Sequence, residues 1–455
     1  MNTLFGTDGY RGTVDYSAET GINPRTFELL SYEYMNLVAE QTGQSPLVIV
    51  GSDTRESGSI LREAAINGAS SAGAEVWDLG IAPTPVIAWL AKKYMANAVA
   101  ITASHNPAGD NGFKPFDIGG DKPTTETLSE LESRYFKLNQ RKLSSMPRSG
   151  KKQNRTDLKF EYLEQTVDLL STIGTLEGKT VIVDGANGAA FELAPLLYKK
   201  LGANVIKFAC HNDGLKINKG VGAAHLDGLV DFIVANKEDL GSSFIGAFAN
   251  DGDADRVMGV DRNGNIVNGN HWMAELAQDQ KGIVGTVYTN SATRKKIKEM
   301  GVEFYECPNG DSNVTAKLKE LTLRLGEGFK RGGEFTGHLI DMDHIPSGDG
   351  LLMGAWLAIK AAQENANLSD VYNNLHLWPE RMVSLKVNGT DSRIIVDTPS
   401  VQDAITKEKD FLGEAGRVIV RASGTEPIIR VWAEAQDVDM LEASTVRLAE
   451  AIQAV

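Results

Sequence analysis

The chain has 455 residues, a length that is enough for two to four domains with separate cores. Hydrophobic residues make up 42% of it and charged residues 23%, fractions that are typical of soluble globular proteins and that argue against a disordered chain. The net charge of -14 at pH 7 would repel nucleic acid and anionic membranes, so an anionic ligand would need locally gathered positive charge.

The cysteine content, the lengths of the apolar runs and the first residues exclude further classes of protein. Cys210 and Cys307 are the only cysteines, which excludes a disulfide framework and leaves too few thiolates for a zinc or iron–sulfur site. No apolar run comes near the roughly 18 residues of a membrane span, and MNTLFGTDGYRG lacks the regions of an export signal. We therefore expect a cytoplasmic protein without a nucleic-acid or membrane partner, and the sequence leaves both a monomer and a homodimer open.

The first third of the chain alternates strand-like apolar runs with helix-like spacing. We predict strands over 46–53, 75–80 and 96–104, and a helix over 57–73. This alternation is typical of βαβ units with a mostly parallel sheet, whose ligands gather at the carboxyl ends of the strands, where Ser104 lies. The polar and basic stretch 141–157 has no periodicity and is predicted to be a surface linker.

The same alternation begins again twice, and the C-terminal part differs from it. Strand-like runs start at 180, 203, 245, 283 and 302, with helices that end near Leu201 and Ala362. The tail has strands over 381–388 and 416–435, typical of an antiparallel α+β domain, and a helix from Asp439. We predict three related α/β domains with mixed sheets and one α+β domain, with bounds 1–150, 151–247, 248–368 and 369–455.

The segment NDGDADR, residues 250–256, carries a carboxylate at every second position. In a loop after a strand, that spacing lets Asp251, Asp253 and Asp255 converge on one divalent cation. A calcium EF-hand does not fit, because Arg256 stands where that loop needs glycine and Arg262 where it needs glutamate. A magnesium-like ion fits better, and a solvated acidic turn is the other interpretation.

The segment RASGTEPIIR, residues 421–430, has the composition of a phosphate clamp. Its backbone N–H groups can cradle a phosphate while two guanidinium groups supply charge. The residues expected to do this are Arg421, Ser423, Gly424, Thr425 and Arg430. A plain hairpin turn with solvent-facing arginines is the alternative.

Three further loops carry groups suited to a sugar phosphate. GGEFTGH, residues 332–338, offers Glu334 and Thr336 to neighbouring sugar hydroxyls, with His338 at its end. FGTDGYRG and GSDTRESG are predicted to expose Arg11 and Arg55 in glycine-bounded turns. Taken singly, a structural glutamate and two surface arginines explain these loops equally well.

Three other function classes are not supported by their motifs. GTLEGKT, residues 174–180, has the wrong glycine spacing for a Walker A loop and precedes a strand, and GDGLLMG, residues 348–354, has the wrong spacing for a dinucleotide fingerprint. Thr102 and Asn106 occupy the glycine positions of a G-x-S-x-G elbow around Ser104. A nucleoside triphosphatase, an NAD enzyme and an α/β-hydrolase are therefore disfavoured.

Taken together, these loops and their order resemble the α-D-phosphohexomutase superfamily. The resemblance spans essentially the whole chain and is carried by FGTDGYRG, GSDTRESG, TASHNPAGDNGFK, VIVDGANGAA, DGDADRV, GGEFTGH, SGDGL and RASGTEPIIRV. It implies four domains around a central cleft, three of them related α/β units and the last a C-terminal domain that binds phosphate.

The resemblance also implies a mechanism. In family members the serine that matches Ser104 is phosphorylated, and its phosphoryl oxygen completes a Mg²⁺ site formed here by Asp251, Asp253 and Asp255. The phosphoryl group passes to a sugar monophosphate, and the resulting hexose 1,6-bisphosphate, also the expected activator, reorients and returns its other phosphate to the serine. The expected result is a shift of phosphate between O1 and O6 of the hexose.

The resemblance gives roles to the neighbouring side chains as well. Proton transfer is expected from Lys114, His105 and His338, with Arg11 and Arg256 stabilising charge. A lysine base needs a lowered pKa, and nearby Arg11 would act in that direction. The turn after Ser104 is expected to expose its hydroxyl and to bring Lys114 back beside it.

The phosphate loop SGTEP and the stretch KINKGVGAAHLD, residues 216–227, resemble the bacterial phosphoglucosamine mutases. That branch implies interconversion of glucosamine 6-phosphate and glucosamine 1-phosphate, and a phosphomannomutase/phosphoglucomutase is the alternative. A non-catalytic sugar-phosphate-binding paralogue would be expected to have lost the serine, the carboxylates or the lysine, and all are intact. A phosphatase is a third possibility, if water reached the phosphoserine.

Overall fold

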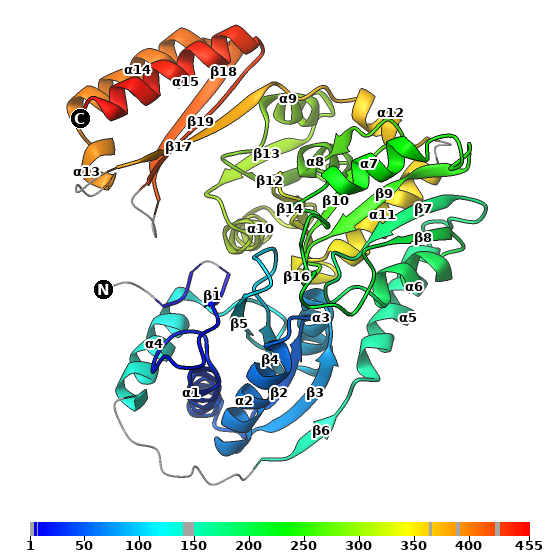
Figure 1. Ribbon diagram of the computed structural model, residues 1–455, viewed down its shortest axis with the longest axis vertical. Helices are drawn as coiled ribbons and strands as arrows, with labels where there is room; N and C mark the ends of the chain where they lie inside the picture. The colour runs from blue at the N-terminus through cyan, green and yellow to red at the C-terminus, as the bar shows by residue number, and fades with distance from the viewer. Residues whose placement is uncertain (1–3, 7, 140–149, 364–365, 388–391, 424–427) are drawn as a thin grey trace. The chain divides into compact units, whose positions relative to one another are not determined.

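The computed structural model describes residues 4–6, 8–139, 150–363, 366–387, 392–423 and 428–455 (Figure 1). The chain divides into two compact units, Met1–Tyr288 with Met300–Asn374 and Thr289–Glu299 with Leu375–Val455. Among the described residues, three sheets with mixed strand directions lie in the first unit and an antiparallel sheet lies in the second. The predicted α/β class with a C-terminal α+β part is confirmed.

The first sheet has the strand order β1-β5-β4-β2-β3-β6. Its parallel centre is formed by β2 (Leu47–Ser52), β3 (Glu75–Ile81) and β4 (Asn97–Ile101). β2 and β4 are mostly apolar and buried, which suits strands that helices cover on both faces. Antiparallel strands β5 (Asp110–Phe116) and β1 (Tyr10–Thr13) extend one edge. The helices are α1 (Pro24–Thr42), α2 (Gly58–Ser71), α3 (Thr84–Tyr94) and α4 (Thr125–Asn139).

The predicted linker 141–157 is corrected at its end. Residues 152–154 form β6 (Lys152–Asn154), which pairs in parallel with β3 and so belongs to the first sheet, whereas 141–149 lie outside the described residues. An exposed polar composition does not exclude an edge strand, because such a strand needs only its backbone to pair on one side. The predicted bound at 150 therefore falls just before a strand of the first sheet.

The second sheet has the order β11-β10-β9-β7-β8. Its strands are β7 (Thr180–Asp184), β8 (Asn204–Phe208), β9 (Phe244–Asn250), β10 (Val257–Val260) and β11 (Ile266–Val267), and its helices are α5 (Leu158–Ser171), α6 (Leu193–Lys200) and α7 (Asp227–Ala235). The block expected to start near 245 as a third domain instead completes this sheet, since β9 pairs with β7. The bound predicted between 247 and 248 consequently lies inside β9.

The third sheet has the order β13-β12-β14-β15-β16. It contains β12 (Gly282–Thr286), β13 (Glu303–Cys307), β14 (Arg331–Gly333), β15 (Leu339–Asp341) and β16 (Ile345–Gly348). The helices of this part are α8 (Gly269–Leu276), α10 (Asp311–Leu325), α11 (Gly350–Gln363) and α12 (Leu368–Asn373). Helix α11 ends close to the predicted position, and its apolar residues on every side suit a helix that is buried along almost its whole length.

The second unit is built on an antiparallel sheet of order β17-β19-β18. Strands β17 (Glu380–Lys386), β18 (Gly416–Ala422) and β19 (Ile428–Ala435) pack under α14 (Pro399–Leu412) and α15 (Val438–Gln453), with α13 (Ser392–Val396) and the 3-10 turn η1 (Gly413–Ala415) beside them. Helix α9 (Ser291–Glu299) belongs to this unit although the chain around it does not. The unit has its own apolar core, centred on Val401, Val431 and Leu448.

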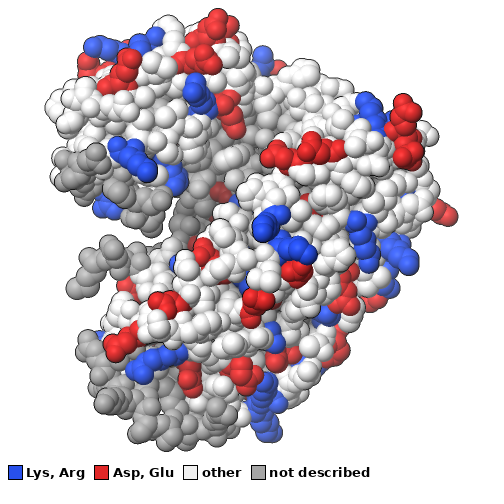
Figure 2. Space-filling model, in the orientation of Figure 1, with Lys and Arg blue, Asp and Glu red and all other residues white. Residues whose placement is uncertain are grey.

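Two global observations bear on partners. No helix among the described residues is long and apolar enough to cross a membrane. On the face in view in Figure 2, the described acidic and basic side chains are interspersed, without an extended basic patch.

Candidate active site

The serine loop joins two antiparallel strands of the first sheet. β4 ends at Ile101, Ser104 and His105 follow, and β5 brings Lys114 back opposite Ala100. The backbone of Ser104 is left-handed, with φ of 51°, and its side chain is fully buried rather than exposed as expected from the turn. Its Oγ donates a hydrogen bond of 2.6 Å to Asp251 Oδ2 and lies 3.3 Å from His105 Nδ1. The hydroxyl thus faces the acidic loop directly.

The acidic loop follows β9 of the second sheet. One carboxylate oxygen from each of Asp251, Asp253 and Asp255 lies within 4.8 Å of the others, and all three side chains are buried. Oδ1 of Asp253 and Oδ1 of Asp255 have no hydrogen-bond partner among the described residues. Buried carboxylate oxygens without a donor are costly unless a cation binds them, so this cluster fits a divalent metal ion.

The pKa values of these carboxyls are pushed in opposite directions. Burial, together with the charges of Asp255 and Asp253, raises the pKa of Asp251 well above its usual value. Burial also acts upward on Asp255, but Lys114 and His338 hold the pKa of that carboxyl well below its usual value. The repulsion that raises the first pKa is the repulsion that a bound cation would relieve.

Lys114 is held among carboxylates and not among cations. Its Nζ lies 2.7 Å from Asp255 Oδ2, 3.0 Å from Asp8 Oδ1 and 3.5 Å from Asp253 Oδ2. Burial and Arg11 act to lower its pKa, but the three carboxylates raise that pKa well above its usual value. Arg11 acts in the expected direction, but the lowered pKa that a lysine base needs is not found, because three carboxylates outweigh burial and Arg11.

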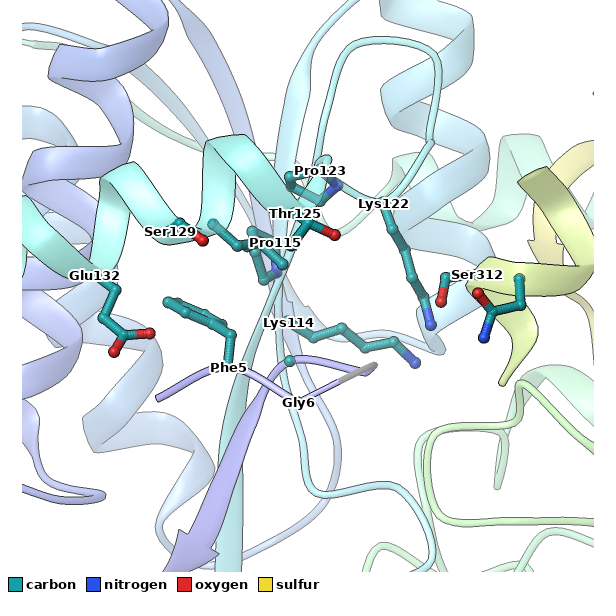
Figure 3. A pocket seen from close by; sticks show the side chains of 13 residues that line it. Phe5, Gly6, Lys114, Pro115, Lys122, Pro123, Thr125, Ser129, Glu132 and Ser312 are labelled. Atoms are coloured by element: carbon teal, nitrogen blue, oxygen red, sulfur yellow. The ribbon is translucent and has the colours of Figure 1, made fainter. Parts of the chain in front are cut away.

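A second set of charged residues was not predicted from the sequence. Lys122 forms ion pairs with Asp8 and with Asp311, the first residue of α10. A cavity of about 460 Å³ is lined by Lys114, Lys122 and Ser312, and the two lysine side chains enter it from different segments with their ends close together (Figure 3). These ion pairs connect the first and third sheets over long sequence distances, so local motifs give no signal for them.

The two predicted histidines have different surroundings. Burial, and then the charges of Arg256 and Arg11, lower the pKa of His105 to about 4. His338 Nε2 lies 3.0 Å from Asp311 Oδ2 and 3.1 Å from the amide nitrogen of Gly348, and Asp311 and Asp255 raise its pKa although burial acts to lower it. His105 is therefore neutral near pH 7, whereas the carboxylates around His338 raise its pKa.

The predicted sugar-binding and charge-stabilising groups lie around the same centre. Glu334 Oε1 accepts a hydrogen bond of 2.9 Å from the amide of Gly310. Thr336 Oγ1 and Arg256 Nε are buried atoms without a hydrogen-bond partner in the described part of the chain, and Arg256 Nε lies 3.8 Å from Asp255 Oδ1. Arg11 pairs with Asp8 and donates to the carbonyl oxygen of Ala103 at 3.4 Å. A polar ligand would supply the hydrogen bonds that these buried atoms lack.

The predicted phosphate clamp lies on the β18–β19 hairpin of the second unit. Arg421 and Arg430 are cross-strand partners, so their side chains leave the same face of the sheet. The amide of Ser423 donates to the carbonyl oxygen of Ile428 at 2.9 Å. Gly424 and Thr425 lie outside the described residues.

The GSDTRESG loop is corrected, because Arg55 is buried and not exposed. Only 2% of the residue is accessible, and its guanidinium pairs with Asp53 at 2.9 Å behind the serine loop. Exposure is the default for arginine, and a sequence does not reveal that backbone carbonyl groups from a distant loop will surround one. Behind the acidic loop, the amide of Ala189 donates to the carbonyl oxygen of Gly252 at 2.8 Å, which gives the VIVDGANGAA motif a supporting position.

Comparisons with known proteins agree with this arrangement. Family models described as phosphoglucomutase/phosphomannomutase match the chain as alpha/beta/alpha domain I over residues 2–142, alpha/beta/alpha domain III over 266–377 and the C-terminal domain over 383–451. A phosphoglucosamine mutase of Polaromonas naphthalenivorans (strain CJ2) is 37% identical over 458 residues, which cover 99% of both chains. Phosphoglucosamine mutase 2 of Shewanella baltica (strain OS185) is 35% identical over 461 residues, again 99% of both.

Solved structures share the fold. A phosphoglucomutase/phosphomannomutase family protein from Burkholderia thailandensis aligns with a TM-score of 0.81 at 24% identity and covers 100% of this chain and 98% of its own. An N-acetylphosphoglucosamine mutase of Aspergillus fumigatus, solved with GlcNAc-6P and magnesium, aligns with a TM-score of 0.69 at 16% identity, over 99% of this chain and 95% of its own.

Proposed function

The chain belongs to the phosphoglucomutase/phosphomannomutase family, and from that membership we propose that its substrates are glucosamine 6-phosphate and glucosamine 1-phosphate. It is a phosphohexomutase, an isomerase that moves a phosphate within a hexose. Relatives 35–37% identical over 99% of the chain carry the name phosphoglucosamine mutase, which supports this sugar. A phosphomannomutase/phosphoglucomutase activity is the alternative, because the matching family models carry that name.

The metal of this site is proposed to be Mg²⁺, held by Asp251, Asp253 and Asp255 together with an oxygen of a phosphoryl group on Ser104. The Oδ1 atoms of Asp253 and Asp255, which accept no hydrogen bond from the described residues, support this ligand set, since hard oxygen donors suit that ion. When bound, the ion neutralises charge on the transferring phosphoryl group.

The reaction is proposed to start from phosphorylated Ser104. An oxygen of the sugar monophosphate attacks the phosphorus, the P–Oγ bond breaks, and the sugar hydroxyl proton is lost while Ser104 Oγ regains one. The bisphosphate then reorients and transfers its other phosphate back to Ser104, so that atoms and protons balance over the cycle. Added hexose 1,6-bisphosphate would phosphorylate enzyme that has lost its phosphoryl group.

The side chains around Ser104 are proposed to divide the remaining tasks. Neutral His105, 3.3 Å from Ser104 Oγ, can accept a proton, and Lys114 and His338 can donate one. Arg11 and Arg256 would stabilise charge, and Glu334 and Thr336 would hold sugar hydroxyls. The proposed phosphate ligands are Arg421, Ser423, Gly424, Thr425 and Arg430.

The observation that carries this proposal is the 2.6 Å contact between Ser104 Oγ and Asp251 in a cluster of three buried carboxylates. A mutase assay comparing glucosamine, glucose and mannose phosphates, each with its own 1,6-bisphosphate, tests the sugar. Clear preference for glucosamine phosphate is expected, and equal rates on all three would defeat that assignment. Release of inorganic phosphate without isomerisation would indicate a phosphatase, and no turnover of any sugar would favour the binding paralogue.

A further inference from the structure

Both backbone groups of Ser104 are held by one buried ion pair that does not touch the hydroxyl. The carbonyl oxygen of Ser104 accepts a hydrogen bond of 2.9 Å from Arg55 Nη2. The amide of Ser104 donates to Thr102 Oγ1 at 2.9 Å, and Thr102 Oγ1 in turn donates to Asp53 Oδ2 at 2.7 Å. Asp53 and Arg55 form an ion pair at 2.9 Å. The hydrogen bonds from the amide and from the carbonyl oxygen of Ser104 therefore end at the same buried ion pair.

Arg55 also determines the path of the chain after Ser104. Its guanidinium donates to the carbonyl oxygen of Asn106 at 2.8 Å, to that of Asp110 at 2.8 Å and to that of Pro107. Together with Ser104, four carbonyl oxygens of one loop converge on a single planar group. An arginine can do this because its five N–H donors lie in a rigid fork, whereas the ammonium of a lysine has three donors at one point.

This convergence matters because Ser104 has an unfavourable backbone conformation. Its φ of 51° lies in the left-handed region, which costs a non-glycine residue energy unless the surroundings impose it. The peptide that follows Ser104 is planar, so fixing its carbonyl oxygen toward Arg55 aims its N–H group away from Arg55. Asn218, from the second sheet's part of the chain, donates to the same carbonyl oxygen at 2.8 Å.

We propose that Arg55 is a positioning residue for phosphoryl transfer, which fixes the backbone of Ser104 so that the hydroxyl stays aligned with the acidic cluster. The inference rests on the proposed role of Ser104 as phosphoryl carrier. Small misplacements of a reacting group reduce the rate strongly, while substrate binding depends on other residues. Arg55 therefore acts on the transfer step and not on the affinity for sugar phosphate.

The test is Arg55→Lys, which keeps the charge beside Asp53 but loses the fork. We expect kcat to fall about 100-fold, a size typical of misplaced reacting groups, while KM for the sugar phosphate changes less than about threefold. The matched control is Arg62→Lys, since Arg62 pairs with Asp78 at 3.1 Å and donates to Ser52 Oγ at 2.6 Å without contacting the serine loop. That control should keep kcat within about twofold of the unsubstituted protein.

A single-turnover measurement distinguishes a role of Arg55 in phosphoryl transfer from a role in folding alone. Phosphoenzyme is isolated, its Ser104 phosphate is quantified by intact mass, and the transfer rate constant is measured per phosphorylated molecule after sugar phosphate is added. A rate constant equal to that of the unsubstituted protein would overturn the proposal, even if less protein folds. If Arg55→Lys does not fold, the same measurement is made on Asn218→Ala, which loses the other hydrogen bond to the Ser104 carbonyl oxygen. Its transfer rate constant should fall about tenfold. An unchanged rate constant would contradict the inference. Failure of the unsubstituted protein to become phosphorylated would instead overturn the proposed function.

Discussion

Ser104 is the residue on which the proposed chemistry depends most directly. Ser104→Ala removes the hydroxyl from a fully buried position and leaves backbone contacts through Thr102 and Arg55 in place. Turnover should fall to background, by about 10⁴-fold or more, because no other group can carry the phosphoryl. The measurement is isomerisation rate with circular dichroism to check folding. Ser444→Ala, another buried serine, should keep full activity, and an active Ser104→Ala protein would refute the mechanism.

Substitution of Asp253, one of the three proposed metal ligands, tests the metal site. Its Oδ2 accepts a hydrogen bond of 2.7 Å from Thr84 and its Oδ1 has no partner among the described residues, so Asp253→Asn keeps the shape but removes a charged ligand. Mg²⁺ affinity, measured by titration calorimetry, should fall about 100-fold or more, and activity should fall with it. Asp231→Asn, at an exposed position on α7, serves as control. Unchanged Mg²⁺ affinity in Asp253→Asn would place the ion elsewhere.

At the scale of elements, the conformation of the acidic loop depends on backbone contacts from a neighbouring loop of the second sheet. A Cβ on Gly188 would lie 2.2 Å from the carbonyl oxygen of Gly252, in the middle of the acidic loop. Gly188→Ala should therefore lower the free energy of unfolding by about 1–3 kcal/mol and weaken Mg²⁺ binding as the loop shifts. Gly109→Ala, where a Cβ meets nothing within 4 Å, is the control for stability in urea unfolding. Equal stability of the two variants would contradict this supporting role.

The elements themselves could largely be predicted, because periodicity is local. The strands at 47–52, 180–184 and 204–208, the apolar helix α11 and the antiparallel tail agree with the sequence patterns. Sheet membership could not be predicted, since β9 looks like the start of a new block yet pairs with β7. Pairing depends on the register between distant segments, which apolar runs do not encode. The domain bounds thus remain predictions, with one of them inside a strand.

The candidate site was predictable where a motif places several reactive groups in one loop. The serine loop and the loop with the three aspartates are such motifs, and the structure places Ser104 beside the aspartate cluster. Lys122 and Asp311 were not recognised as parts of the site, and Arg55 was expected there as an exposed group, because their partners include residues more than 40 positions away. The pKa of Lys114 was expected to move in the wrong direction for the same reason: the carboxylates around it come from other segments.

At the scale of the whole molecule, the second unit is formed by two segments that are separated in the sequence, Thr289–Glu299 and Leu375–Val455. Helix α9 joins the C-terminal sheet through Glu434, which is fully buried and accepts hydrogen bonds from the amide and hydroxyl of Ser291. Arg417 pairs with the same carboxylate at 2.6 Å and donates to the carbonyl oxygen of Thr289 at 2.7 Å. One carboxylate therefore ties residues 289–299 to a sheet that begins about 80 residues later.

This arrangement predicts that the second unit has its own stability, which Glu434 supports. Glu434→Ala leaves Arg417 beside an empty site and releases the start of α9, so the second unit should lose about 3 kcal/mol or more. Asp403→Ala breaks an exposed pair with Lys407 in α14 and should cost under about 1 kcal/mol. In calorimetry, the Glu434 variant should show a transition moved to lower temperature beside one that stays in place, since the first unit has separate cores. A single transition that moves as a whole would mean that the two units unfold together, and would contradict their independence.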